Sequence, residues 1–174
     1  MKLKTLGLLF CLLSAFASGQ ALRAAPPSAA GRVDVIFFER EKFTDVKDGF
    51  LETPKGRDAI LDQLKEHIVS EAKWYVPEGW KLTVTITDID LAGDYEPARG
   101  AAFQDIRVIR EIYPPKIDLA FKLVDPDGNE TRHGTRQLTD LDFMNRLTLD
   151  HQDPLRFEKQ LLDDWMRRDL PRVK

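Results

Sequence analysis

The segment Lys81–Asp90 (KLTVTITDID) limits the possible folds more than any other part of the chain. Its aliphatic residues alternate with threonines, which is the period-two pattern of a strand with one buried face. After Ile86 the apolar phase moves to Ile89 and Leu91, and this predicts a β-bulge near Asp88. Such a strand needs other elements to cover its apolar face.

Four other segments have the composition of strands: Val33–Phe38, Ile106–Tyr113, Lys116–Val124 and Thr131–Thr139. The third has aliphatic or aromatic residues at every second position. It is followed by Asp125–Asn129 (DPDGN), a strong turn signal. We therefore expect the last two segments to form a β-hairpin.

Two long helices are also predicted. Thr53 before a proline is a typical helix start, and apolar residues follow at helical spacing through Arg57–Trp74. Asp153, again before a proline, opens a final helix with an apolar stripe that includes Trp165. A short helix is expected at Leu141–Leu149.

The expected order is strand, helix, a group of mainly antiparallel strands, then helix. The simplest architecture with this order is an α+β two-layer sandwich. It would contain a mainly antiparallel sheet of about four or five strands, with the two main helices on one face.

The first residues have the pattern of a bacterial export signal. Lys2 and Lys4 precede an apolar run, and Ala15–Ala17 fits the small-x-small pattern of a cleavage site. We expect a signal peptide over residues 1–17, cleavage after Ala17 and a periplasmic location. Residues 18–31 are rich in Ala, Ser, Gly and Pro and are expected to be a flexible leader. A single domain would then occupy residues 32–174, with no transmembrane anchor.

Composition excludes several classes of function. The only cysteine, Cys11, lies inside the predicted signal, so the exported chain has no disulfide, thiol nucleophile or zinc–thiolate site. Acidic residues outnumber basic ones by 29 to 26, which argues against binding to nucleic acid. No Gly-x-Ser-x-Gly motif or glycine-rich phosphate loop is present, so no catalytic residue and no cofactor are predicted.

Four carboxylates lie close together after the clearest strand: Asp88, Asp90, Asp94 and Glu96. Several oxygen ligands on a loop can hold a hard cation, so these residues are candidate metal ligands. Their spacing does not match the twelve-residue calcium loop.

Two other interpretations of this acidic group remain open. Asp88 and Asp90 could pair with Arg107 and Arg110 of a neighbouring strand, or the carboxylates could form a catalytic pair. Together these two aspartates and two arginines form the candidate functional surface.

Several segments together resemble a family of exported proteins from Gram-negative bacteria, known as domain of unknown function number 3016. The resemblance rests on Phe43–Val46, Leu82–Gly93, Ile106–Arg110, Tyr113–Pro115 and the closing helix around Glu158 and Trp165. Asp88–Gly93 (DIDLAG) is its most specific part. At Arg40 the chain departs from the pattern, where the family commonly has proline. The resemblance implies one compact periplasmic domain and no particular reaction.

These observations favour a non-catalytic binding or accessory domain of the cell envelope, whose partner is a protein or an envelope component. The alternative is a metal-dependent hydrolase of an envelope polymer that uses Asp88, Asp90 and Asp94 as ligands. The partner, the ligand and the oligomeric state are not encoded in any motif of the sequence.

Overall fold

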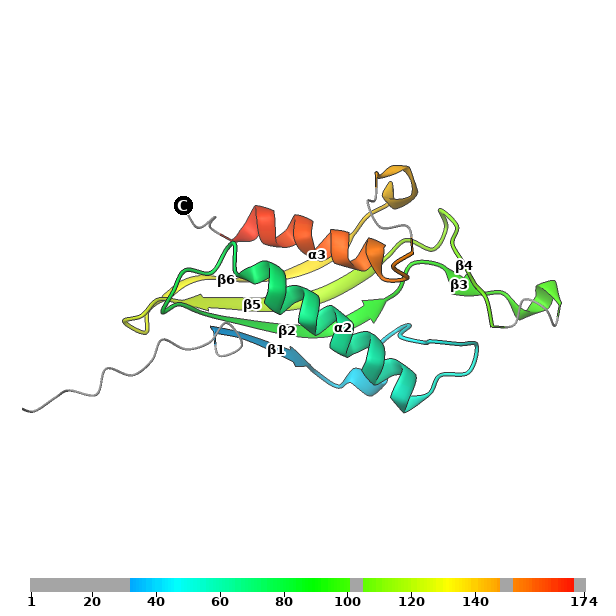
Figure 1. Ribbon diagram of the computed structural model, residues 1–174, viewed down its shortest axis with the longest axis horizontal. Helices are drawn as coiled ribbons and strands as arrows, with labels where there is room; N and C mark the ends of the chain where they lie inside the picture. Colours follow the sequence, from blue (N-terminus) through cyan, green and yellow to red (C-terminus); the bar gives the residue numbers. More distant parts are fainter. Residues whose placement is uncertain (1–31, 101–104, 148–151, 171–174) are drawn as a thin grey trace, which may run out of the picture.

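The computed structural model describes residues 32–100, 105–147 and 152–170. The predicted signal peptide and leader lie outside these residues, as do positions 148 and 149 of the predicted short helix. Four strands form the main sheet in the order β1-β2-β5-β6 (Figure 1). Their bounds are Val33–Phe37, Lys81–Asp90, Lys116–Val124 and Glu130–Thr139.

The pairing in this sheet is mixed. β1 runs parallel to β2, whereas the β2–β5 and β5–β6 pairs are antiparallel. The predicted hairpin is confirmed, since the Asp125 carbonyl accepts a hydrogen bond from the Gly128 amide and the Asp125 amide donates one to the Asn129 carbonyl. The predicted bulge is confirmed as well, because the β2–β5 register shifts between Ile86 and Asp88.

The prediction of a long strand at Ile106–Tyr113 was wrong. Only Arg107–Val108 forms a strand, β4, which pairs with β3 (Asp94–Tyr95) in a separate two-stranded sheet. Past Val108 the chain turns back, with the Tyr113 amide bonded to the Arg110 carbonyl. β-Branched composition was misleading here because the segment pairs with a loop and not with the main sheet.

The two main helices are confirmed. α2 covers Pro54–Ala72, and the Thr53 hydroxyl caps it by accepting a hydrogen bond from the Gly56 amide at 3.0 Å. α3 covers Arg156–Asp169. The Asp153 carboxylate accepts from the Leu155 amide at 2.9 Å, just before this helix.

Three 3₁₀ turns complete the described residues: η1 (Arg40–Lys42), η2 (Pro97–Arg99) and η4 (Phe143–Asn145). The last one is all the helix that forms in the described part of the predicted segment Leu141–Leu149.

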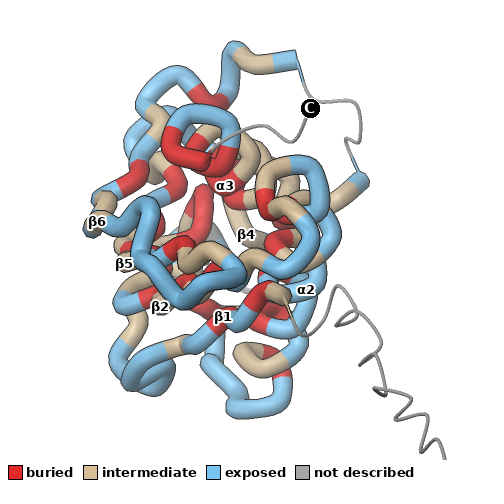
Figure 2. Tube along the Cα trace, turned by 90° about the vertical axis from the view of Figure 1, so that its left-hand side faces the viewer, coloured by how far each residue is buried: buried red, intermediate tan, exposed pale blue. Residues whose placement is uncertain are grey.

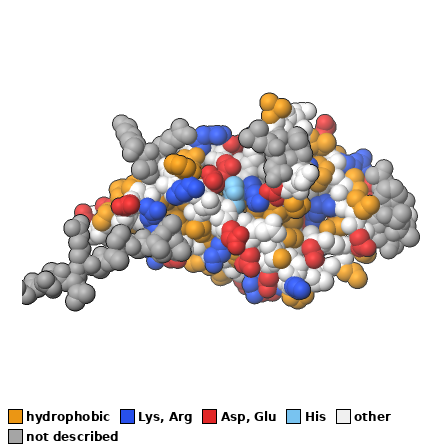
Figure 3. Space-filling model, in the orientation of Figure 1, with side chains coloured by type: hydrophobic (Ala, Val, Ile, Leu, Met, Phe, Trp, Pro, Cys, Tyr) orange, Lys and Arg blue, Asp and Glu red, His pale blue; other side chains and the backbone are white. Residues whose placement is uncertain are grey.

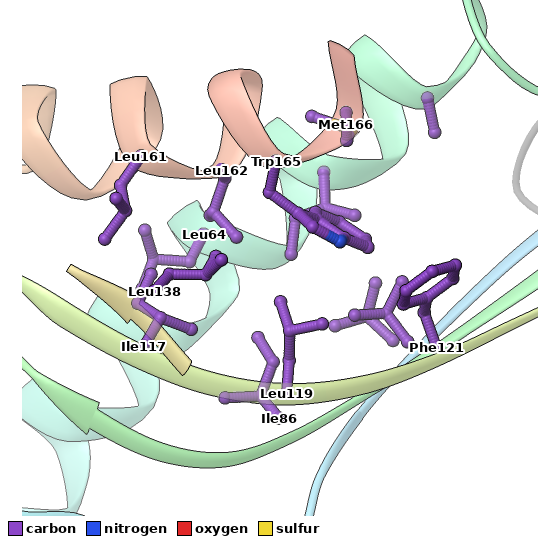
Figure 4. Packing of buried hydrophobic residues seen from close by; sticks show 14 of the residues in the cluster. Leu64, Ile86, Ile117, Leu119, Phe121, Leu138, Leu161, Leu162, Trp165 and Met166 are labelled. Carbon is purple, nitrogen blue, oxygen red and sulfur yellow. The ribbon is translucent and has the colours of Figure 1, made fainter. Parts of the chain in front are cut away.

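Most buried residues of the strands and helices meet in one large hydrophobic core (Figures 2 and 4), and Ala92, Phe143 and Phe157 form a smaller cluster of their own. Strand residues in this core alternate along each strand, as in Leu82, Val84 and Ile86 of β2. Trp165 of α3 is fully buried and packs edge-on against Phe121 of β5, with ring centroids 5.5 Å apart. Among the described residues no helix is long and apolar enough to span a membrane.

Candidate functional site

The candidate residues lie where β2 ends and β3 and β4 begin, at the right of Figure 1. Asp88, at the bulge, accepts hydrogen bonds from both the backbone amide and the hydroxyl of Thr44, each at 2.7 Å. A third hydrogen bond comes from the Ile89 amide at 2.9 Å. The Asp88 carboxylate therefore joins β2 to the segment after η1.

Asp90 forms an ion pair with Lys116, at 2.8 Å, and the two residues are opposite one another in the β2–β5 register. The hydrogen bond and charge of Asp90 raise the pKa of Lys116 above its ordinary value. Asp90 thus has a lysine partner across the strand pair.

Asp94 and Glu96 have partners of their own. The Asp94 carboxylate accepts from the Tyr95 amide at 2.7 Å, and Glu96 accepts from Arg110 at 2.9 Å. The hydrogen bond to Glu96 raises the pKa of Arg110. Within the three described stretches, no three acidic, histidine or cysteine side chains gather in a way that could hold a metal ion.

The expected pairing of Asp88 and Asp90 with Arg107 and Arg110 was wrong. Arg107 instead forms a bidentate ion pair with Asp45, with Nη–Oδ distances of 2.9 and 3.1 Å. Asp45 comes from the loop after η1, which lies beside the end of β2 through a bridge to Asp90. Arg107 therefore pairs with a residue 62 positions away in the sequence, and not with the aspartates of β2 that the local spacing had indicated.

Arg107 also holds two backbone segments together. It donates to the Gly93 carbonyl at 2.9 Å and to the Lys47 carbonyl at 3.1 Å, and its guanidinium lies 4.8 Å from the centroid of the Tyr95 ring. Burial acts to lower the pKa of Arg107, but the hydrogen bonds and charge of Asp45 outweigh it, so this pKa is raised. The Arg107 guanidinium therefore stays positively charged and is held in place by these contacts.

Gly93 is required for this arrangement. Its φ of 80° is a backbone conformation that other residues rarely adopt, and a Cβ at this position would lie 2.7 Å from the Val108 carbonyl oxygen. The glycine therefore allows β4 to approach closely enough for Arg107 to reach the Gly93 carbonyl. This explains in physical terms the last residue of the DIDLAG string.

A buried carboxyl group lies on the other side of this loop. Glu158 of α3 is only 1% exposed; its Oε1 accepts from the Ala92 amide at 2.7 Å, while no described group hydrogen-bonds to Oε2. Burial raises the pKa of Glu158, and the opposing effects of the Ala92 amide and the Arg107 charge do not offset it. Burial therefore shifts Glu158 toward its neutral form relative to an exposed glutamate.

A cavity of about 290 Å³ opens beside these groups, between the start of α2, the loop after β2 and the start of α3. Much of its wall is apolar, and polar side chains complete it. The lining residues are Lys47, Asp48, Gly56, Ala59, Ile60, Gln63, Leu91, Ala92, Tyr95, Arg107, Pro154 and Leu155. Concave, largely apolar sites with a few polar groups are typical of ligand binding.

Sequence reasoning placed Arg107 in the candidate surface but missed Asp45, Tyr95 and the cavity. A signal for Asp45 and Glu158 did exist, because both lie in segments on which the family resemblance rests. Asp90 and Asp94 line a second, smaller hollow together with Asp45, of about 220 Å³. Asp88 and Arg110 line neither this hollow nor the cavity.

The described residues thus define an α+β domain with a cavity braced by a buried ion pair. The chain belongs to the family described as protein of unknown function DUF3016, whose model matches residues 31–168. The match confirms the resemblance seen in the sequence. No curated protein matches the chain.

Proposed function

We propose that the protein is an exported, periplasmic domain of the cell envelope that binds a ligand or partner without catalysing a reaction. The observation that carries this proposal is the 290 Å³ cavity, whose wall includes Arg107. Arg107 donates to one carboxylate and two backbone carbonyls, so it acts as a brace and not as an acid or base.

The chemistry of the wall indicates the kind of ligand. Ile60, Leu91 and Leu155 provide apolar contact. Lys47 and Asp48 add charges of opposite sign, and Gln63 adds an amide. A small amphipathic molecule, or an apolar side chain of a partner flanked by polar groups, fits this combination. We also propose that the domain has the two-layer sandwich architecture expected from the sequence. Its support is that residues of both α2 and α3 pack with the strands in the hydrophobic core.

The proposal is tested by filling the cavity. Ala59 is exposed on α2 and lines the cavity, so Ala59→Phe should obstruct it without disturbing the core. Ala98→Phe is the matched control, since Ala98 is also exposed but does not line the cavity. The three proteins would be incubated with an envelope extract, and retained molecules identified by mass spectrometry.

We expect the unmodified protein and the control variant Ala98→Phe to retain one compound or partner, and Ala59→Phe to lose it. Equal retention by all three proteins would reject the cavity as the binding site.

The metal-dependent hydrolase is the alternative proposal. Asp45, Asp90 and Asp94 line one 220 Å³ hollow, but among the described residues they do not gather as metal ligands, so a bound ion would have to draw them together. An ion at about 100 times its dissociation constant would add roughly 2.7 kcal/mol to the free energy of unfolding. Thermal melts with Ca²⁺, Mg²⁺, Mn²⁺ and Zn²⁺ should show no shift if the protein is a binding domain. A shift that disappears in Asp90→Ala would favour the hydrolase.

A further inference from the structure

A groove of about 730 Å³ lies between β1 and α2, away from the candidate functional site. Four consecutive residues of the strand, Val33–Ile36, line one side. The other side consists of helix residues: Asp62, Lys65, Glu66, Val69 and Ser70. Because consecutive strand residues line it, the groove follows the backbone of β1 and not just one side chain.

Within the described part of the chain, no other strand pairs with the outer edge of the β1 backbone on this side. β1 is the edge of the main sheet, and among the described residues it pairs only with β2. The Phe38 amide donates to the Ile86 carbonyl at 2.9 Å, so the amides of every second residue, including Ile36, point toward β2. The N–H and C=O groups of Val33, Val35 and Phe37 therefore point to the free edge.

The two edges of the sheet differ in how they are protected. On β6, the opposite edge, Arg136 reaches back to Asp169 of α3 with a 3.0 Å hydrogen bond, and His133 lies 2.6 Å from the Glu130 carboxylate. Charged side chains of this kind discourage pairing with another strand. β1 has a single charged residue, Asp34, which is already paired with Lys81 at 2.8 Å.

We propose that the groove binds an extended, basic peptide segment of a partner protein, which adds to the sheet as a strand next to β1. Backbone hydrogen bonds to the free edge would supply affinity, and side-chain contacts with α2 would supply specificity. Asp62, Glu66 and Val69 are spaced four and three positions apart, so they share one face of α2. The segment thus places lysine or arginine beside the two carboxylates and an apolar residue against Val69.

The charge of the wall selects this occupant. Asp62 and Glu66 outnumber Lys65, so a basic strand is attracted and an acidic one repelled. Acidic and basic side chains are otherwise interspersed on the face seen in Figure 3, which carries α2 and α3. A second copy of β1 (VDVIF) would bring another aspartate and no basic residue.

The test uses two synthetic probes, an eight-residue peptide that alternates valine with lysine and its valine–glutamate counterpart. Fluorescence anisotropy measures binding of each labelled peptide to the protein. We expect the lysine peptide to bind and the glutamate peptide to bind at least about tenfold more weakly. The double variant Asp62→Lys/Glu66→Lys should weaken the lysine peptide by about tenfold, and Lys65→Gln should not weaken it.

A proline substitution in β1 tests whether the peptide adds as a strand or only contacts the side chains of the groove. Val35→Pro removes an amide that points to the free edge, a position where a strand tolerates proline. Val35→Ala removes similar packing but keeps the amide, so it is the matched control. We expect Val35→Pro to bind the lysine peptide about fivefold more weakly than Val35→Ala does, the effect of one hydrogen bond. Circular dichroism would verify that both variants fold.

Three results would overturn the proposal. They are no binding of the lysine peptide, equal binding of the two peptides, or equal affinity in Val35→Pro and Val35→Ala. Analytical sedimentation of the protein alone measures its oligomeric state, and we expect no dimer that forms through the β1 edge. A dimer that Val35→Pro dissociates would mean that a second copy occupies the groove instead.

Discussion

Arg107 and Arg110 lie three residues apart in the chain but occupy opposite environments. The Arg107 side chain is 16% exposed and makes a bidentate pair with Asp45, which is itself 9% exposed. Arg110 is 52% exposed and makes one 2.9 Å hydrogen bond to Glu96. One arginine is part of the internal framework, and the other is part of the solvated surface.

The difference teaches that burial and partner number decide what such a residue contributes. A buried ion pair is strongly destabilised when one partner is removed, because the other charge is left without compensation. An exposed pair loses little, since water and salt replace the missing partner. Matched substitutions at the two arginines therefore measure this contrast directly.

The largest effect is expected for Arg107→Met, which leaves the Asp45 carboxylate buried and removes two hydrogen bonds to backbone carbonyls. We expect the free energy of unfolding to fall by about 3–5 kcal/mol, as measured by urea denaturation. Lys47, with its Nζ 3.7 Å from the Asp45 carboxylate, would compensate only a small part.

The double variant Asp45→Asn/Arg107→Met is the control. It removes the stranded charge and should recover part of the lost stability. A double variant that is less stable than Arg107→Met by the full cost of Asp45→Asn would show that the two residues are not energetically coupled.

Arg107→Lys should have a smaller effect. It keeps the positive charge but loses the planar fork that reaches Asp45, Gly93 and Lys47 together. We expect a loss of about 2 kcal/mol in the same urea experiment, and a weaker hold on the loop after β2. A lysine variant as stable as the unmodified protein would mean that charge alone, and not geometry, is needed here.

Glu158→Gln tests the buried carboxyl through pH. Because the folded protein raises the pKa of Glu158 above its ordinary value of 4.5, the folded state holds this proton more tightly than the unfolded state does. The stability from Glu158 is thus complete below that ordinary value and is lost as pH rises through the raised pKa. Glutamine stays neutral and still accepts from Ala92.

We therefore expect Glu158→Gln to gain stability relative to the unmodified protein as pH rises from about 4 to 8, by on the order of 1 kcal/mol. Urea denaturation at a series of pH values provides the difference. A gap between the two proteins that stays constant with pH would rule out titration of Glu158 in this range.

The smallest effect is expected for Arg110→Met, the counterpart of Arg107→Met. Arg110 itself is 52% exposed, so water screens its ion pair with Glu96, and the midpoint of thermal unfolding should change little. The result should also be the same in low and high salt. A large drop in the midpoint would place Arg110, like Arg107, in the framework of the fold.

The main elements of the fold could be predicted because their signals are local. The alternation in Lys81–Asp90, the turn before β6 and the Thr53 cap all depend on residues close together in sequence. The bulge at Asp88 was visible for the same reason, as a change of apolar phase within one strand.

The candidate site was less predictable. Composition alone made Ile106–Tyr113 look like a full strand, whereas only two of its residues pair. The acidic group after β2 looked like one site, but Asp88, Asp90 and Glu96 have three different partners from three different segments.

By itself, the sequence determined the α+β class and the family. It also determined the strands and helices in which apolar residues recur at every second position or at helical spacing. Only the tertiary structure decided that Arg107 pairs with Asp45, that Glu158 lies buried beneath Ala92, and that a cavity opens between them and α2. The physical reason is distance along the chain. Secondary structure follows from neighbours, whereas the partner of a buried charge depends on which distant loop the packed core brings to it.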